Sequence, residues 1–349
     1  MKGGQKAGAA GTAAVLFLAF FFCAVFSGCA PRTPVTDSFF AMDTVFQTCF
    51  YGENSARCLS GIQTLSAELD RAFSVSSETG LTARVSSAPV GKPAVCSEDE
   101  RALLEKVRMY TEKSGGRFDV TVGSLKRLWN ASEKAERLPD AEETAQAMKL
   151  VGPDGWRLEK DGIVSLKAGL QLDFGGAAKG YAADRILNVM KAQNVTGFVS
   201  LGGCIACRGT KPGGKPFCFG LKTPEAGASD CFATLTLPGD GVLSTSGDYE
   251  RFYRIGGRTY SCILDPLTGR PSESLFRSVT VFGPDGTVTD ILSTWLMLLT
   301  PRQAFEAAEE AGCRMIAVGK DDTVYLSEEL RDCFVLRPEH RDYTLRWMS

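Results

Sequence analysis

The segments FVSL (residues 198–201), FCFGL (217–221) and CFATLTL (231–237) decide the fold of this chain. All three are rich in the aromatic, β-branched and other apolar residues that favour strands, and they are separated by stretches containing glycine and proline. Strands that follow one another without a helix between them argue for an α+β fold. They argue against the strict alternation of strand and helix that builds a doubly wound parallel sheet.

Further strands are expected on both sides of these three. The hairpin signal Gly256-Gly257 joins a strand at 252–255 to one at 258–264. The other expected strands lie at residues 39–51, 164–172, 278–282, 315–318 and 323–326. The chain should therefore form mixed or antiparallel sheets.

Helices should flank these sheets. Ser97 and Glu100 form the pattern of a capping box and predict a helix that ends near Ser114. The other expected helices are at 55–73, 131–149, 179–193, 289–299 and 301–311. Residues 76–95, rich in serine, glycine and proline, predict a loop.

Composition excludes several functional classes. Apolar residues make up 44% of the 349, so the chain is not disordered, and a net charge of -2 gives no sign of nucleic-acid binding. His340 is the single histidine, which rules out a histidine-rich zinc site and any Ser-His-Asp triad that does not use it. The 12 cysteines are scattered and mostly suggest small buried apolar residues, although an extracytoplasmic location would allow one or two disulfides.

The N-terminus has the features of a secretion signal. Lys2 and Lys6 precede an apolar run at 13–26, which is shorter than the roughly 20 residues of a membrane-spanning helix. Phe26-Ser27-Gly28-Cys29 resembles a bacterial lipobox. It predicts a signal peptide at 1–28, lipidation of Cys29, a tether at 29–37 and a domain at 38–349, held at the cell membrane and facing outside the cytoplasm. The alternatives are an ordinary signal peptide or an N-terminal anchor helix.

Asp173-Phe174-Gly175-Gly176 precedes a helix that begins near Lys179. A glycine pair lets a ligand approach the backbone, and a helix N-terminus with a lysine can receive phosphate. A tight strand-to-helix turn would need the same glycines.

A second glycine pair, Gly202-Gly203, precedes Cys204 and Cys207. This one C-x-x-C does not indicate a zinc ribbon, and its strand-like sequence does not favour a redox pair. The polar segment 243–251 predicts a turn that hydrogen-bonds phosphate or ribose, or simply a capped turn.

Asp290 and Thr294 lie four residues apart on a predicted helix and so share one face. A carboxylate and a hydroxyl placed in this way suit a hard cation such as Mg²⁺. The alternative is that Asp290 is an N-cap residue.

Taken in order, these clusters resemble the FAD:protein FMN transferase family, also called ApbE or thiamine-biosynthesis lipoproteins. The similarity begins at Met42-Asp43-Thr44 and at residues 118–125 (FDVTVGSL). It continues, in order, at 173–180, at Gly202-Gly203, at 245–248, at Asp265-Pro266 with Gly269, and at 290–294. The family implies an ApbE-like, T-fold-like architecture. It also implies transfer of FMN from FAD to a threonine or serine hydroxyl of an extracytoplasmic or membrane redox protein, with Mg²⁺ present and AMP released.

The resemblance assigns roles to individual residues. The implied FAD-binding residues are Met42, Phe118, Asp119, Val120, Asp173, Lys179, Gly203, Ser246 and Ile263. Mg²⁺ would bind the side chains of Asp290 and Thr294 and the carbonyl of Gly176. Lys179 would offset charge on the pyrophosphate. Asp173, Asp248 and Cys262 are the candidate bases.

Cys262 stands where the family commonly has a histidine that is a suspected base. Two alternatives follow from this departure. The chain could be a metal-dependent FAD pyrophosphatase that releases FMN and AMP, or a lipoprotein that binds FAD without turnover.

Overall fold

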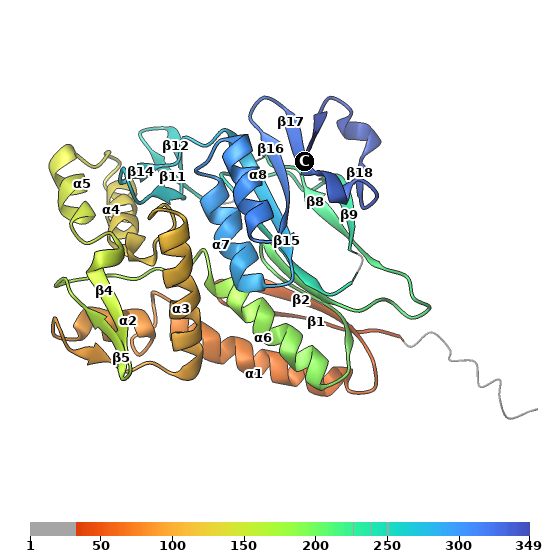
Figure 1. The fold of residues 1–349 in the computed structure, drawn as a ribbon, viewed down its shortest axis with the longest axis horizontal. Helices are drawn as coiled ribbons and strands as arrows, with labels where there is room; N and C mark the ends of the chain where they lie inside the picture. The colour runs from red at the N-terminus through yellow and green to blue at the C-terminus, as the bar shows by residue number, and fades with distance from the viewer. Residues whose placement is uncertain (1–32, 226, 238, 250) are drawn as a thin grey trace, which may run out of the picture. The chain divides into compact units, whose positions relative to one another are not determined.

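A nine-stranded mixed sheet forms the centre of the computed structural model, which describes residues 33–225, 227–237, 239–249 and 251–349. Its order is β1-β2-β6-β7-β10-β15-β16-β17-β19, and every neighbouring pair is antiparallel except β17 with β19. The strands are β1 (Val35–Ala41), β2 (Thr44–Tyr51), β6 (Thr196–Leu201), β7 (Cys204–Arg208), β10 (Gly241–Gly247), β15 (Phe276–Gly283), β16 (Arg314–Gly319), β17 (Thr323–Ser327) and β19 (Thr344–Met348). The expected α+β class with mixed sheets is confirmed (Figure 1).

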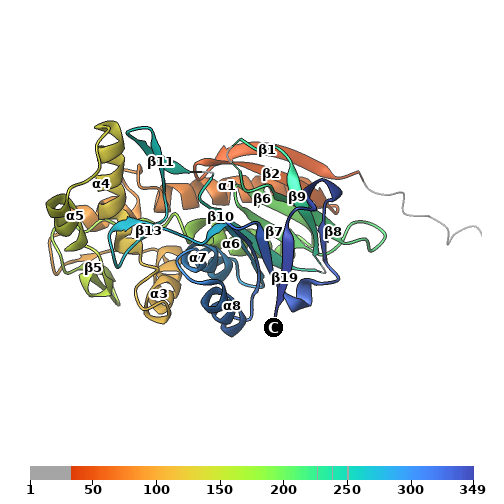
Figure 2. The same ribbon diagram turned by 90° about the horizontal axis from the view of Figure 1, so that it is seen from above.

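The sheet has a different partner on each face. One face packs against the helices α1 (Ser55–Phe73), α6 (Ala178–Ala192), α7 (Gly286–Leu296) and α8 (Pro301–Glu310). The other carries a second sheet of β8 (Phe217–Lys222), β9 (Cys231–Leu237) and β18 (Phe334–Leu336), as Figure 2 shows from above. Alternation along β16 feeds both cores, because Met315 and Ala317 face the helices while Ile316 and Val318 face the small sheet.

A third part of the chain lies beside the helical layer. Its helices are α2 (Leu81–Ser87), α3 (Glu98–Lys113), α4 (Gly123–Lys134) and α5 (Ala141–Met148). Its strands form three small sheets: β3 (Pro93–Ala94) with β5 (Gly162–Ser165) and β4 (Trp156–Glu159), β11 (Phe252–Ile255) with β12 (Arg258–Ser261), and β13 (Leu264–Asp265) with β14 (Arg270–Pro271). Short 3-10 turns lie at Val120–Val122, Pro153–Gly155, Glu328–Leu330 and Pro338–His340. A small core that includes Trp129, Tyr253 and Leu264 joins α4 to the β11–β12 hairpin.

Several helices begin where the sequence predicted. The helix α1 has the expected bounds, and α3 has its capping box: Ser97 Oγ accepts from Glu100 N at 3.2 Å while Glu100 Oε2 accepts from Ser97 N at 2.9 Å. The predicted β11–β12 hairpin also forms.

The single strand predicted at 39–51 is wrong, because residues 35–51 form a hairpin. β1 and β2 pair from Val35 with Phe50 to Ala41 with Thr44, and β1 includes residues 35–37 of the predicted tether. Met42 and Asp43 form the turn with φ of 49° and 58°. Positive φ at both central residues matches the twist of a two-residue hairpin, but Met-Asp lacks the glycine that normally marks one.

Three other boundaries were wrong. The predicted loop at 76–95 contains α2 and β3, and the predicted strand at 164–172 is limited to β5, which ends at Ser165. The predicted helix at 131–149 is two helices: α4 ends at Lys134, and α5 begins after its own capping box of Asp140 with Glu143. That capping box was present in the sequence and marks the break.

The crossing of α6 and α7 depends on Gly180. A Cβ at this position would lie 2.0 Å from the carbonyl oxygen of Gly286 and 2.5 Å from Cβ of Asp290. We expect Gly180→Ala to lower the free energy of unfolding by about 2–3 kcal/mol, because backbone atoms cannot move aside cheaply. Urea denaturation would measure this.

Gly61→Ala, in the exposed face of α1, is the matched control. Its Cβ would meet only Val189 Cγ1 at 3.6 Å, an ordinary contact, so stability should be unchanged or slightly higher. Equal stability of the two variants would show that α6 and α7 separate without cost.

Candidate functional site

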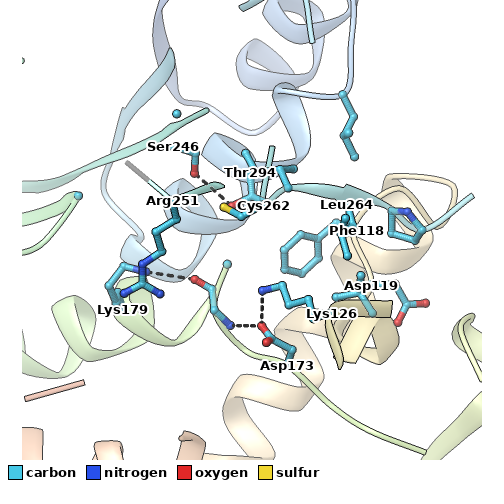
Figure 3. A pocket seen from close by; sticks show the side chains of 18 of the residues that line it. Phe118, Asp119, Lys126, Asp173, Lys179, Ser246, Arg251, Cys262, Leu264 and Thr294 are labelled. Carbon is cyan, nitrogen blue, oxygen red and sulfur yellow. Dashed lines mark hydrogen bonds and ion pairs between the residues drawn. The ribbon is translucent and has the colours of Figure 1, made fainter. Parts of the chain in front are cut away.

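A cavity of about 350 Å³ opens between the helical layer, the end of β10 and the third part of the chain. We call it the first cavity (Figure 3). It is lined by Thr44, Arg117, Phe118, Asp119, Val122, Lys126, Asp173, Gly175, Gly176, Lys179, Gly202, Gly203, Thr245, Ser246, Gly247, Arg251, Cys262, Ile263, Leu264, Pro266, Thr294 and Leu298. Ten of the predicted FAD-binding, catalytic and metal-binding residues therefore line one cavity: Phe118, Asp119, Asp173, Gly176, Lys179, Gly203, Ser246, Cys262, Ile263 and Thr294.

The charge of the first cavity favours an anion. Four basic side chains line it, those of Arg117, Lys126, Lys179 and Arg251, against the two acids Asp119 and Asp173. Basic side chains that converge on a concave surface attract phosphate groups. Lys126 was missed in the sequence, although it directly follows the 118–125 motif that the resemblance used.

Asp173 organises this basic wall. Its Oδ1 accepts from Lys126 Nζ at 2.7 Å and from Gly175 N at 2.9 Å, while Lys179 Nζ donates to Gly175 O at 3.1 Å. Burial acts to raise the pKa of Asp173, but Lys126, the Gly175 N–H and Lys179 outweigh it and hold the pKa below its usual value. A carboxylate so stabilised is a weak base, so Asp173 is better suited to positioning Lys126.

Asp119 has an unused acceptor. Its Oδ1 accepts from Thr121 N at 2.8 Å and from Thr121 Oγ1 at 2.7 Å. Oδ2 is buried and has no hydrogen-bond partner among the described residues, and burial raises the pKa of the carboxyl group. A buried acceptor without a partner is costly, so a donor group on a bound ligand would stabilise it.

The three predicted metal-binding residues converge at α7. Asp285 is the N-cap of this helix, so the alternative interpretation of Asp290 as an N-cap is wrong. Asp290 Oδ2 accepts from Gly180 N at 2.9 Å, which fixes the carboxylate. Thr294 lies one turn further on, and a Cβ added to Gly176 would be 3.0 Å from Thr294 Oγ1.

These groups offer oxygen atoms only: a carboxylate, a hydroxyl and a backbone carbonyl. That donor set fits a hard divalent cation whose other ligands are water or phosphate oxygens. The described residues contain no cluster of three or more histidine, cysteine or acidic side chains that could hold a metal ion.

Ser246 belongs to a strand. The segment 243–251 was predicted to be a turn, but β10 continues to Gly247. Ser246 Oγ lies 3.2 Å from Thr294 Oγ1 and 2.9 Å from Ser293 Oγ. We call the carboxylate of Asp290, the hydroxyl of Thr294 and the carbonyl of Gly176 the oxygen cluster of α7, and β10 contacts it through Ser246.

Cys262 lies half-buried in the wall of the first cavity. Burial raises the pKa of this thiol above its usual value, although Lys126 and Arg251 act in the opposite direction. The side chain is therefore a neutral thiol at pH 7, which does not support Cys262 as a thiolate base near neutrality.

Four predicted site residues do not line the first cavity: Met42, Val120, Asp248 and the buried Asp290 described above. Val120 is only 1% exposed, and its carbonyl oxygen accepts from Asp173 N at 2.7 Å, so it positions Asp173. Met42 packs against the core next to Thr44. Asp248 lines a neighbouring cavity and forms an ion pair with Lys320 at 3.5 Å, so it does not share a cavity with the other two candidate bases, Asp173 and Cys262.

Cys204 and Cys207 do not form a pair. They face opposite sides of β7 and belong to different cores, as expected for residues three apart in a strand. All ten described cysteines carry free thiols, and four of them, Cys58, Cys204, Cys207 and Cys313, are buried. The expectation that most are buried was wrong, because five are only half-buried and Cys218 is exposed.

The order and geometry of these groups can be compared with known proteins. A profile of the ApbE family matches residues 42–317. The chain belongs to the ApbE family. The match covers every residue of the first cavity, and it includes the basic wall and the oxygen cluster of α7.

The chain is similar to proteins named FAD:protein FMN transferase in Treponema pallidum (30% identical over 259 residues, 69% of this chain and 71% of the relative) and in Klebsiella pneumoniae (27% over 321 residues, 86% and 90%). Among solved structures it is similar to the ApbE protein of Thermotoga maritima, with a TM-score of 0.76, 27% identity and 89% and 99% of the two chains covered. The flavinyl transferase ApbE of Pseudomonas stutzeri gives a TM-score of 0.71, 26% identity and coverage of 83% and 93%.

Proposed function

We propose that this ApbE protein transfers FMN from FAD to a threonine or serine hydroxyl of another protein and releases AMP. The observation that carries the proposal is the position of a basic, anion-binding wall directly beside the oxygen cluster of Gly176, Asp290 and Thr294. Relatives named for this activity support it.

The reaction exchanges one phosphorus–oxygen bond for another. The acceptor oxygen bonds to the phosphorus of the FMN half, the P–O bond to the AMP half breaks, and the hydroxyl proton leaves to a base or to water. Protein side chains contribute to such a transfer mainly by positioning and by offsetting charge. Lys179 and Lys126 would hold the pyrophosphate, and the Asp119 Oδ2 would accept a hydrogen bond from a donor group of FAD.

The side chains of Asp290 and Thr294 and the carbonyl of Gly176 would hold Mg²⁺ there. The bound cation would supply charge neutralisation of the pyrophosphate. The chain's own contribution is a carboxylate whose Oδ2 is fixed by the Gly180 N–H at 2.9 Å.

The test is intact-mass measurement of an acceptor protein incubated with the enzyme, FAD and Mg²⁺. A gain of one FMN phosphoryl group on the acceptor, abolished by EDTA, is the expected result. AMP and FMN without any adduct would instead establish a pyrophosphatase, and bound FAD with no AMP would establish a flavin-binding protein. Either of these results would overturn the proposal.

We propose in addition that the chain is a lipoprotein anchored at the outer side of the cell membrane, where it would modify an extracytoplasmic or membrane redox protein. The signal peptide and Cys29 lie outside the described residues, so the support is the lipobox-like sequence alone. Among the described residues, no helix is long and apolar enough to span a membrane.

Cys29→Ala is expected to move the protein from the membrane fraction to the soluble extracytoplasmic fraction, because the cysteine would carry the acyl chains that hold it. Fractionation followed by immunoblotting would measure the shift. Cys218→Ala, an exposed cysteine of the folded part, is the control and should stay in the membrane fraction. Membrane retention of the Cys29 variant would contradict a lipid anchor.

A further inference from the structure

A second cavity, of about 1080 Å³, lies beside the first. Its walls come from α4, the segment leading into α5, α5 itself, the β11–β12 hairpin and the turn around β14, which lie side by side in Figures 1 and 2. None of its lining residues is shared with the first cavity, and the proposed transfer gives it no role so far.

The two cavities meet along one wall. At three places, neighbouring residues of the chain line different cavities. The first cavity is lined by Gly247, Arg251 and Cys262, and the second by the adjacent residues Asp248, Phe252 and Ser261. Consecutive Cα atoms are about 3.8 Å apart, so at three points of the chain the wall between the two cavities is one residue thick. A molecule in the second cavity therefore lies close to the Cys262 end of the first.

The second cavity differs from the first in charge. Its acids Asp140, Asp248 and Glu273 balance its bases Arg254, Arg270 and Lys320. It also carries the aromatic side chains of Trp129, Tyr249, Phe252 and Tyr260. A neutral, aromatic surface suits a polypeptide with apolar side chains better than it suits phosphate groups.

The second cavity is also more open. About half of its lining residues are exposed, including Leu138 at 49%, whereas in the first cavity only Gly175, Gly202 and Arg251 are exposed. An open groove admits a macromolecular segment without closing over it.

One of its walls offers backbone for pairing. β12 pairs only with β11 among the strands of the described chain. A strand with one unpaired edge can hydrogen-bond an extended peptide, which gives affinity with little dependence on sequence.

We propose that the second cavity docks the acceptor protein, as an extended and largely uncharged segment whose hydroxyl residue enters the first cavity past Ser261 and Cys262. The inference rests on the proposed function and adds where the acceptor binds. Its chemistry is an apolar or aromatic flank around a threonine or serine.

Leu138→Arg and Ala145→Arg test this by placing bulky charges in the groove. Both positions are exposed, so the fold should tolerate the change. Gln146→Arg is the matched control, because this residue is also exposed on α5 but does not line the cavity. The probe is a synthetic undecapeptide library with one central threonine and random flanks, and flavin fluorescence and mass identify the labelled peptides.

For the best-labelled peptide, the two groove variants should raise KM at least 10-fold, with kcat and the Kd for FAD unchanged, while Gln146→Arg behaves as wild type. Unchanged KM in both groove variants would overturn the docking proposal and leave the transferase proposal standing. A raised Kd for FAD would show that the groove holds part of FAD, which also overturns it. If the wild-type enzyme labels no peptide, the proposal that a short segment docks in the second cavity is overturned. If an acceptor protein still gains FMN under the same conditions, the proposed function stands.

Discussion

Asp290→Asn is expected to lower the rate of FMN transfer about 100-fold or more, since a bound cation contributes several kcal/mol to charge stabilisation in such reactions. The substitution is chosen because asparagine keeps an oxygen that can accept the Gly180 N–H, now 2.9 Å from Asp290 Oδ2. The packing of α6 on α7 is thus retained while the negative charge is removed. Intact mass of the acceptor over time gives the rate.

Asp285→Asn is the matched control on the same helix. Asp285 caps α7 through its Oδ1, which accepts from Val288 N at 3.0 Å, and asparagine is an equally good N-cap. It should transfer FMN at close to the wild-type rate. If Asp290→Asn kept both the rate and the sensitivity to EDTA, the cation would have to bind elsewhere.

Cys262→His is expected to raise FMN transfer at pH 7 by about 10-fold or more. Burial raises the pKa of the Cys262 thiol above its usual value, so the native side chain is protonated at neutral pH. A histidine with its ordinary pKa of about 6.5 is largely neutral at pH 7 and can take the acceptor proton, and general bases contribute about 10²–10⁴. The first cavity adjoins the side chain and gives space for the ring.

The pH profile separates a base from a merely better-packed residue. In Cys262→His, transfer should rise as the pH increases through about 6.5, whereas the wild-type rate should still be rising above pH 9 if the thiolate serves as base. Cys262→Ser, which has no group titrating in this range, should show neither rise. A histidine variant with the wild-type rate and profile would place the base outside position 262.

The sequence was sufficient for the class of fold and for many of the residues that line the first cavity. Consecutive strands without helices between them indicated α+β, and the capping box of Ser97 and Glu100 located a helix end, because both signals are local. The spacing of Asp290 and Thr294 also predicted that they share a helix face, which is a property of the helix alone. Local signals failed at Met42-Asp43, where a turn formed without glycine because the pairing of β1 with β2 imposes it.

Only the tertiary structure decided what depends on distant contacts. It paired Lys126 with Asp173, 47 residues away, and brought Gly176 against Thr294, since neither approach follows from sequence spacing. It also placed Asp248 in the lining of the second cavity and not of the first. The relative position of residues within one helical turn or one strand can be predicted from their spacing in the sequence. The charge of a cavity depends on which helices and strands pack together, and the spacing of residues in the sequence does not give that packing.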